Sequence, residues 1–123
     1  MTQPLALVLY ERLLPGTQLV NRLQDIGYRV QKIHPPETLV AVAEKEKPLV
    51  VFVDLESTKS MVCEFIAQLK QHPATKHLPV IAFASEEHAE LQTAAQAVGA
   101  LITGENAILH HLPQVLDQAL QMD

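Results

Sequence analysis

The sequence predicts an α/β domain built on a doubly wound, five-stranded parallel sheet of order 2-1-3-4-5. Apolar runs of strand length alternate five times with segments of helical period, which is typical of right-handed βαβ units. The runs at 5–9, 49–53 and 78–83 are continuously apolar and therefore suit the interior of a parallel sheet. The run at 28–33 alternates and the run at 100–103 is short, so these two suit the edges. Few strand orders satisfy all three observations, and 2-1-3-4-5 is the natural one.

The first two helices are predicted in the connections that follow the first and second strands. The first helix has an apolar stripe at helical spacing, formed by Leu19, Leu23 and Ile26. Gly27 follows this stripe, and glycine commonly ends a helix at this position. Pro35-Pro36 breaks the chain after the second strand, and we expect it to open a helix that continues to about Glu46.

Three further helices are predicted from apolar stripes of the same spacing. The third helix has Val62, Phe65, Ile66 and Leu69; the fourth has Leu91, Ala94, Ala95 and Val98; the last has Leu112, Val115, Leu116 and Ala119. Gly99 ends the fourth helix. Pro79 stands at the start of the fourth strand, where a missing N–H is tolerated.

Composition restricts the class of protein. A chain of 123 residues that is 48% apolar suits one globular domain, which we expect to span 1–123. The apolar runs are too short for a membrane span, and no signal-peptide pattern opens the chain. The net charge of −5 argues against binding of a nucleic-acid backbone. With Cys63 as the single cysteine, an internal disulfide is excluded, which fits a cytoplasmic protein.

The candidate functional site lies at the carboxyl end of the third strand, where Asp54 ends the run Leu49–Val53. In the predicted order the winding of the sheet reverses between strands one and three, and a crevice opens there. Glu11 follows the first strand, so we expect Glu11 and Asp54 to face each other across this crevice. Two carboxylates can hold Mg²⁺, and Asp54 could then act as a nucleophile toward phosphorus. The alternative is structural, because acidic residues after strands often form turns or cap helices.

The chain resembles the receiver domain of two-component response regulators over Leu5–Leu120. The matching landmarks are Leu19-x-x-x-Leu23, Gly27-Tyr28-x-Val30, Pro48-Leu49-Val50-Val51-Phe52-Val53-Asp54, Leu78-Pro79-Val80-Ile81 and Gly99-Ala100. The resemblance implies a flavodoxin-like (βα)5 three-layer sandwich in which Asp54 accepts a phosphoryl group from a phosphohistidine. It also implies Mg²⁺ as the candidate ion, held by Glu11, Asp54 and the backbone of Glu56.

Several positions that have a functional role in the family carry other residues in this chain. The family's acidic pair falls on Tyr10 and Glu11, and its phosphoryl-binding hydroxyl falls on Ala84. Its lysine falls on Asn106 and its switch aromatic on Thr103. Phosphoryl transfer places charge on three equatorial oxygens, which a cation normally neutralises. Because removing one preorganised donor commonly slows a reaction by roughly 10²–10³-fold, the resemblance implies little phosphorylation.

We therefore expect a stand-alone, non-enzymatic pseudo-receiver that works in a phosphorelay by protein–protein contact. The resemblance implies a sensor kinase or a downstream effector as its partner, or a homodimer, and no nucleic acid or membrane. The contact face predicted from the family carries Gln92, Gln96, Glu105 and His110.

Two alternatives remain. One is a working phospho-acceptor that uses Asp54 with Mg²⁺, and the other is a flavodoxin-like domain that binds a small molecule at the same crevice. His110 and His111 do not suggest a metal site, because neighbours on a predicted helix point about 100° apart.

Overall fold

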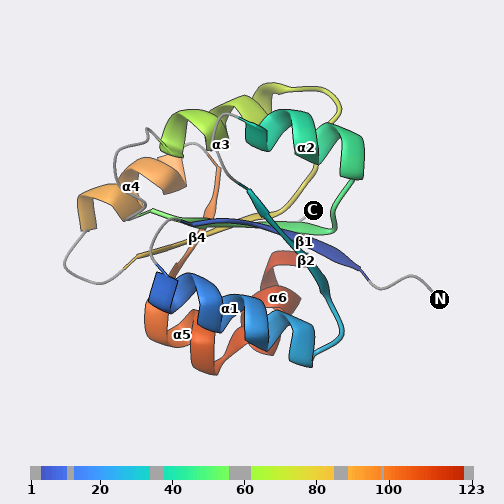
Figure 1. Ribbon diagram of the computed structural model, residues 1–123. Coiled ribbons are helices and arrows are strands. Elements are labelled where there is room, and N and C mark those ends of the chain that lie inside the picture. The colour runs from blue at the N-terminus through green and yellow to red at the C-terminus, as the bar shows by residue number, and fades with distance from the viewer. Residues whose placement is uncertain are drawn as a thin grey trace.

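The computed structural model describes residues 4–10, 13–33, 38–55, 62–84, 89–97 and 99–120. These residues form one parallel sheet of order β2-β1-β3-β4-β5 with helices on both faces (Figure 1). In chain order the elements are β1 (Leu5–Leu9), α1 (Leu13–Asp25), β2 (Arg29–Ile33), α2 (Leu39–Glu46), β3 (Val50–Asp54), α3 (Val62–Gln71), β4 (Val80–Ala84), α4 (Ala89–Ala97), β5 (Leu101–Gly104), α5 (Glu105–His110) and α6 (Leu112–Leu120). The predicted fold class and strand order are confirmed.

The core lies on the two faces of the three central strands. Strands β1, β3 and β4 are buried along their whole length, as their uninterrupted apolar sequences predict. Alternate side chains point to opposite faces, so that Val51 and Val53 pack under α2, α3 and α4. Val50 and Phe52 instead pack against α1, α5 and α6. The sheet is therefore the middle of three layers.

The two remaining strands lie at the edges, as predicted. Strand β2 pairs only with β1 among the described strands, and it runs from an exposed Arg29 to a buried Ile33. Strand β5 pairs with β4 and is half-buried throughout. Edge strands with a solvated side need fewer apolar residues, which explains why their sequences were less continuous.

Left-handed backbone turns end three of the helices. Gly27 and Gly99 have φ angles of 96° and 100°, where glycine alone has no steric penalty. They follow α1 and α4, and both helix ends match the prediction. Lys47 closes α2 in the same region with φ at 51°, and its backbone N–H donates to the carbonyl of Ala43 at 3.0 Å.

Two residues that were predicted on the apolar stripes of helices are exposed. Ile26 is 43% exposed, because α1 ends at Asp25 and the turn through Gly27 carries Ile26 off the apolar stripe. Ala94 is exposed, whereas Ala95 beside it is buried.

The predicted last helix is in fact two helices separated at His111. Pro113 explains the break, because in a continuous helix its ring would clash with the carbonyl of Leu109. In the first turn of a new helix the same proline is tolerated. The four predicted inner residues of α6 are buried: Leu112, Val115, Leu116 and Ala119. Within the described ranges no helix is long and apolar enough to cross a membrane.

Candidate functional site

Asp54 is the last residue of β3 and lies at the carboxyl end of the sheet. Its side chain has an exposed fraction of 0%. In the described part of the chain, no buried side-chain nitrogen or oxygen lacks a hydrogen-bond partner. Strand β3 lies between β1 and β4, so Asp54 borders the point where the winding of the sheet reverses. This is the position that the sequence predicted.

Tyr10 directly follows β1, at the same edge of the sheet as Asp54 at the end of β3. The register pairs Leu9 with Val53, so that the next residue of each chain is Tyr10 and Asp54. The Tyr10 ring is only 8% exposed and belongs to the core cluster beneath α1. It lies against Gly16 in the first turn of α1, where a Cβ atom would overlap the ring. A buried aromatic ring therefore occupies the position that the resemblance assigns to an acid.

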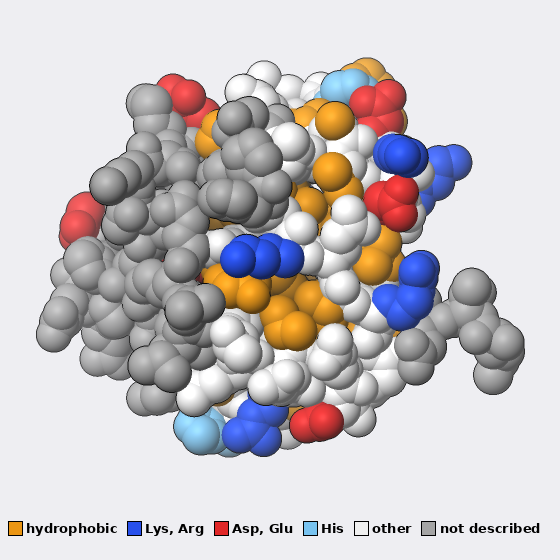
Figure 2. All heavy atoms as spheres, in the orientation of Figure 1, with side chains coloured by type: hydrophobic (Ala, Val, Ile, Leu, Met, Phe, Trp, Pro, Cys, Tyr) orange, Lys and Arg blue, Asp and Glu red, His pale blue; other side chains and the backbone are white. Residues whose placement is uncertain are grey.

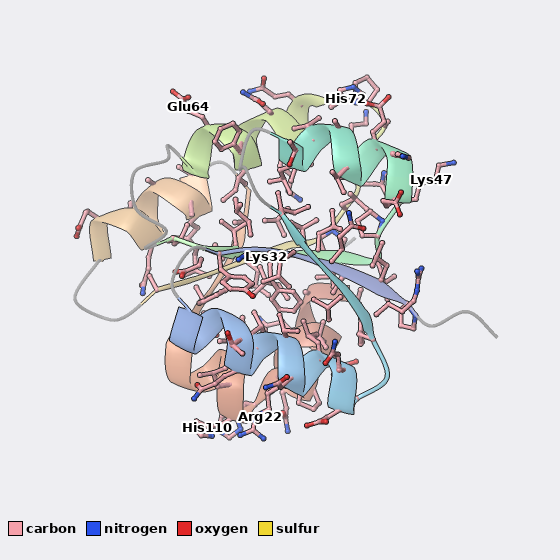
Figure 3. All side chains as sticks on the ribbon, in the orientation of Figure 1. Arg22, Lys32, Lys47, Glu64, His72 and His110 are labelled. Atoms are coloured by element: carbon pink, nitrogen blue, oxygen red, sulfur yellow. The ribbon has the colours of Figure 1, made fainter. Side chains whose placement is uncertain are left out.

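Lys32 covers this ring from the open edge of the sheet. Its Nζ atom lies 4.7 Å from the centroid of the Tyr10 ring, within the range of a cation–π contact. Figure 2 shows one basic side chain crossing an apolar patch at the centre of this face, and Figure 3 labels Lys32 there in the same orientation. The register pairs Lys32 with Val8, so its side chain points to the α1 face of the sheet. The resulting cluster of Tyr10, Gly16 and Lys32 is called the Tyr10 cluster below.

Gly16 and Lys32 were not predicted from the sequence as neighbours of the site. A signal for Lys32 was present, because on an edge strand of period two every second residue faces the same helix layer as Tyr10. Gly16 gave no such signal, since its role depends on where the Tyr10 ring lies.

Ala84 ends β4, one residue beyond Phe83, which the register pairs with Asp54. Its methyl group is completely buried and offers no hydrogen bond at the position of the family's hydroxyl. Gln92 of α4 donates from Nε2 to the Ala84 carbonyl at 3.5 Å. Gln92 belongs to the predicted contact face, and it is half-buried and reaches back to the sheet. Its part in a contact stays a prediction.

Thr103 lies on β5 opposite Phe83 and is half-buried. Asn106 is the second residue of α5, but its side chain, with those of Cys63 and Glu105, lies outside the described residues. Glu11 and Glu56 are outside them entirely. The predicted approach of Glu11 to Asp54 therefore stays a prediction.

The predicted metal site depends on Glu11, Asp54 and the backbone of Glu56, of which only Asp54 is among the described residues. No three histidine, cysteine, aspartate or glutamate residues in those ranges come together as a ligand group. Asp54 alone does not make an octahedral Mg²⁺ site, and the neighbouring Tyr10 adds no carboxylate. Two of the predicted Mg²⁺ ligands, Glu11 and Glu56, lie outside the described residues, so the Mg²⁺ site stays a prediction.

His110, predicted on the contact face, is the last residue of α5 and is exposed. Together with Arg22 it lines a shallow hollow between α1 and α5, and Figure 3 shows the two side chains next to each other. His111 lies in the break between α5 and α6, so the two histidines do not share one helix. Gln96 of α4 is exposed, as expected.

Comparison with known proteins supports the fold. No family model and no curated protein sequence matches this chain. Solved structures match over nearly its whole length. The receiver domain of a sensor histidine kinase from Pseudomonas aeruginosa, with a magnesium ion in its active-site cleft, has a TM-score of 0.85 at 14% identity, covering 97% of this chain and 98% of that one.

Two further structures are similar to the same degree. The chemotaxis protein CheY4 of Vibrio cholerae has a TM-score of 0.82 at 21% identity and covers 97% of this chain and 100% of that one. The receiver domain of NtrX from Brucella abortus has a TM-score of 0.81 at 21% identity, with 96% and 99% covered. The chain therefore has the fold of response-regulator receiver domains.

Proposed function

We propose that this chain is a receiver-like domain of two-component signal transduction that acts by protein–protein contact, with weak or no phosphorylation of Asp54. The observation that carries the proposal is the Tyr10 cluster. It places a packed aromatic ring directly after β1, at the position that the resemblance to receiver domains assigns to an acid.

Two changes at this site act on the same chemical step. A neutral phenol ring at Tyr10 cannot contribute the negative oxygen ligands that a hard cation prefers. The buried methyl group of Ala84 cannot donate a hydrogen bond to a phosphoryl oxygen. Each loss of a preorganised group commonly slows a reaction by roughly 10²–10³-fold, although such effects are not additive. Asp54 would keep its place in the sheet and lose most of its reactivity.

The proposed output is a contact with a protein and not a chemical reaction. A sensor kinase or a downstream effector is the proposed partner, and the proposed contact face is α4 with β5. Gln96 is exposed on this face, and the half-buried strand β5 has no further strand beside it among the described residues. Light scattering over a range of concentrations tests for a homodimer, which should weaken in Gln96→Lys.

Phosphorylation of Asp54 can be tested directly. The purified chain is incubated with Mg²⁺ and acetyl phosphate, and its intact mass is measured. We expect no phosphoryl adduct on the wild-type chain. We expect an adduct on a variant that restores the family's groups, Tyr10→Asp with Ala84→Ser and Asn106→Lys. A wild-type adduct that disappears in Asp54→Asn would overturn the proposal.

One observation favours the second candidate function, a working phospho-acceptor. Lys32 places a cation over the Tyr10 ring. Tyr10 directly follows β1, which pairs with the strand that Asp54 ends. A cation from the edge strand could replace the lysine that the family carries at the position of Asn106. If the wild-type chain gains the adduct and Lys32→Gln loses it while Lys45→Gln keeps it, this second function is supported.

A further inference from the structure

A cavity of about 700 Å³ opens at the amino-terminal edge of the sheet, at the opposite end of β3 from Asp54. Residues that directly precede β3 and β4, the first residue of β5 and the end of α6 form its wall. They include Pro48, Leu49, Leu78, Pro79, Leu101 and Leu120. Its volume falls within the range that is usual for sites of small molecules, roughly 300–1,000 Å³.

The wall of this cavity is largely apolar and partly open to solvent. Leu49 is 42% exposed and is one of two large hydrophobic residues that are exposed in the described part of the chain. Leu101 and Leu120 are half-buried beside it. When a ligand covers an exposed apolar side chain, the free energy falls by about 25 cal/mol per Å² of apolar surface that is buried.

The charged side chains among the described lining residues, Lys70 and Lys76, are both cationic, and His77 also lines the cavity. No aspartate or glutamate is among these residues. This arrangement is unusual in a chain of net charge −5. A cavity with apolar walls and cationic side chains complements a molecule with an apolar body and an acidic group.

Hydrogen bonds hold the Lys70 side chain and the turn that carries Lys76 and His77. The Nζ atom of Lys70 donates to the carbonyl of Leu78 at 2.9 Å, which fixes its ammonium group at the cavity. The turn that carries Lys76 and His77 is anchored by Thr75, whose buried Oγ1 donates to the carbonyl of Leu69 at 2.7 Å. Groups that are already placed lose less conformational entropy when a ligand binds.

We propose that this cavity binds a small amphipathic anion, such as a medium-chain carboxylate. The aliphatic part lies on Leu49, Leu101 and Leu120, and the carboxylate faces Lys70, Lys76 and His77. A second copy of the chain is a poorer occupant, because a symmetric contact through this surface would bring like charges together. The site is distinct from the crevice at Asp54, where the flavodoxin-like alternative would bind its small molecule.

Titration of the ¹⁵N-labelled chain with decanoate tests this proposal by NMR. We expect saturable shifts of the backbone amides of Leu49, Leu78 and Leu101. Decanol has the same chain without the charge and should bind several-fold more weakly. Lys76→Gln should weaken decanoate binding by about two- to fivefold, whereas Lys45→Gln, on an exposed position of α2, should not.

A matched pair of variants separates charge from apolar contact. Leu49→Glu and Leu49→Gln remove the same leucine, but only the glutamate repels an anion. We expect Leu49→Glu to weaken decanoate at least about fivefold more than Leu49→Gln, because a like charge opposes the carboxylate at close range. Circular dichroism confirms that each variant is folded. Shifts that do not saturate or that centre elsewhere, equal binding of decanol, or equal affinities of the two Leu49 variants would each overturn the proposal.

Discussion

The aromatic ring of Tyr10 lies so close to the Cα atom of Gly16 that a Cβ atom at residue 16 would overlap it. Glycine normally weakens a helix by about 0.5–1 kcal/mol relative to alanine. At this position its missing side chain makes room for the ring, so the first turn of α1 and the end of β1 are fitted to each other.

Gly16→Ala should destabilise the protein although alanine is the better helix former. Overpacking of a well-filled site typically costs about 1–3 kcal/mol, which exceeds the gain in helix propensity. Urea denaturation measures the free energy of unfolding. Gln18→Ala, at an exposed position of the same helix, should change that free energy by less than about 0.5 kcal/mol.

The same substitution should change sign once the ring is removed. In a Tyr10→Ala background, Gly16→Ala should be neutral or stabilising by up to about 1 kcal/mol, because only the propensity difference remains. A loss of stability that is equal in both backgrounds would show that the ring is not what excludes a side chain from residue 16.

Lys32→Gln should lower the free energy of unfolding by about 0.5–1 kcal/mol, because the variant loses the cation over the Tyr10 ring. Lys32→Arg should keep most of this contribution, since a guanidinium also binds an aromatic face. The control is a double-mutant cycle with Tyr10→Leu, in which the effect of Lys32→Gln should disappear. An effect that survives without the ring would assign Lys32 another role.

Alkaline pH should destabilise the folded chain through Tyr28. Burial raises the pKa of the Tyr28 phenol above its ordinary value of 10.0, because the phenolate would lose solvation. The unfolded chain then releases this proton first. The stabilising contribution is fully present below pH 10.0 and is lost as the pH rises through the folded pKa. Urea midpoints measured on both sides of this pH should fall less steeply for Tyr28→Phe than for the wild type.

Lys47→Gly should raise the free energy of unfolding by about 1 kcal/mol. Lys47 adopts a left-handed φ of 51° at the end of α2, where a residue with a Cβ atom is strained and glycine is not. Lys45→Gly, inside the same helix, should have the opposite effect at about the same size. Thermal denaturation of the two variants gives the comparison, and a destabilising Lys47→Gly would contradict the assigned strain.

Most of the fold could be predicted because continuous apolar runs in the sequence indicate which strands are buried. The third run gave the position of Asp54 at the carboxyl end of β3, and the sheet order followed from which runs were apolar throughout. The break at His111 was missed, because the apolar spacing continues past it and only Pro113 indicates a new helix.

The surroundings of the site were less predictable than its location. The resemblance assigns Tyr10 to the position of an acid, but the sequence does not indicate that the ring turns into the core and lies on Gly16. Nor does it place Lys32 over that ring, because this contact depends on the pairing of β2 with β1. Contacts between residues far apart in the chain depend on register and rotamer, which local patterns do not specify.

The edge strand β2 has a consequence for self-association. An outer strand leaves one row of backbone N–H and C=O groups able to pair with a strand from another molecule, which is how fibrils and sheet-to-sheet aggregates begin. Arg29 and Lys32 are both exposed on β2, and a lysine or arginine on an outer strand hinders such pairing. The charge that covers Tyr10 thus also helps to keep the molecules apart at high concentration.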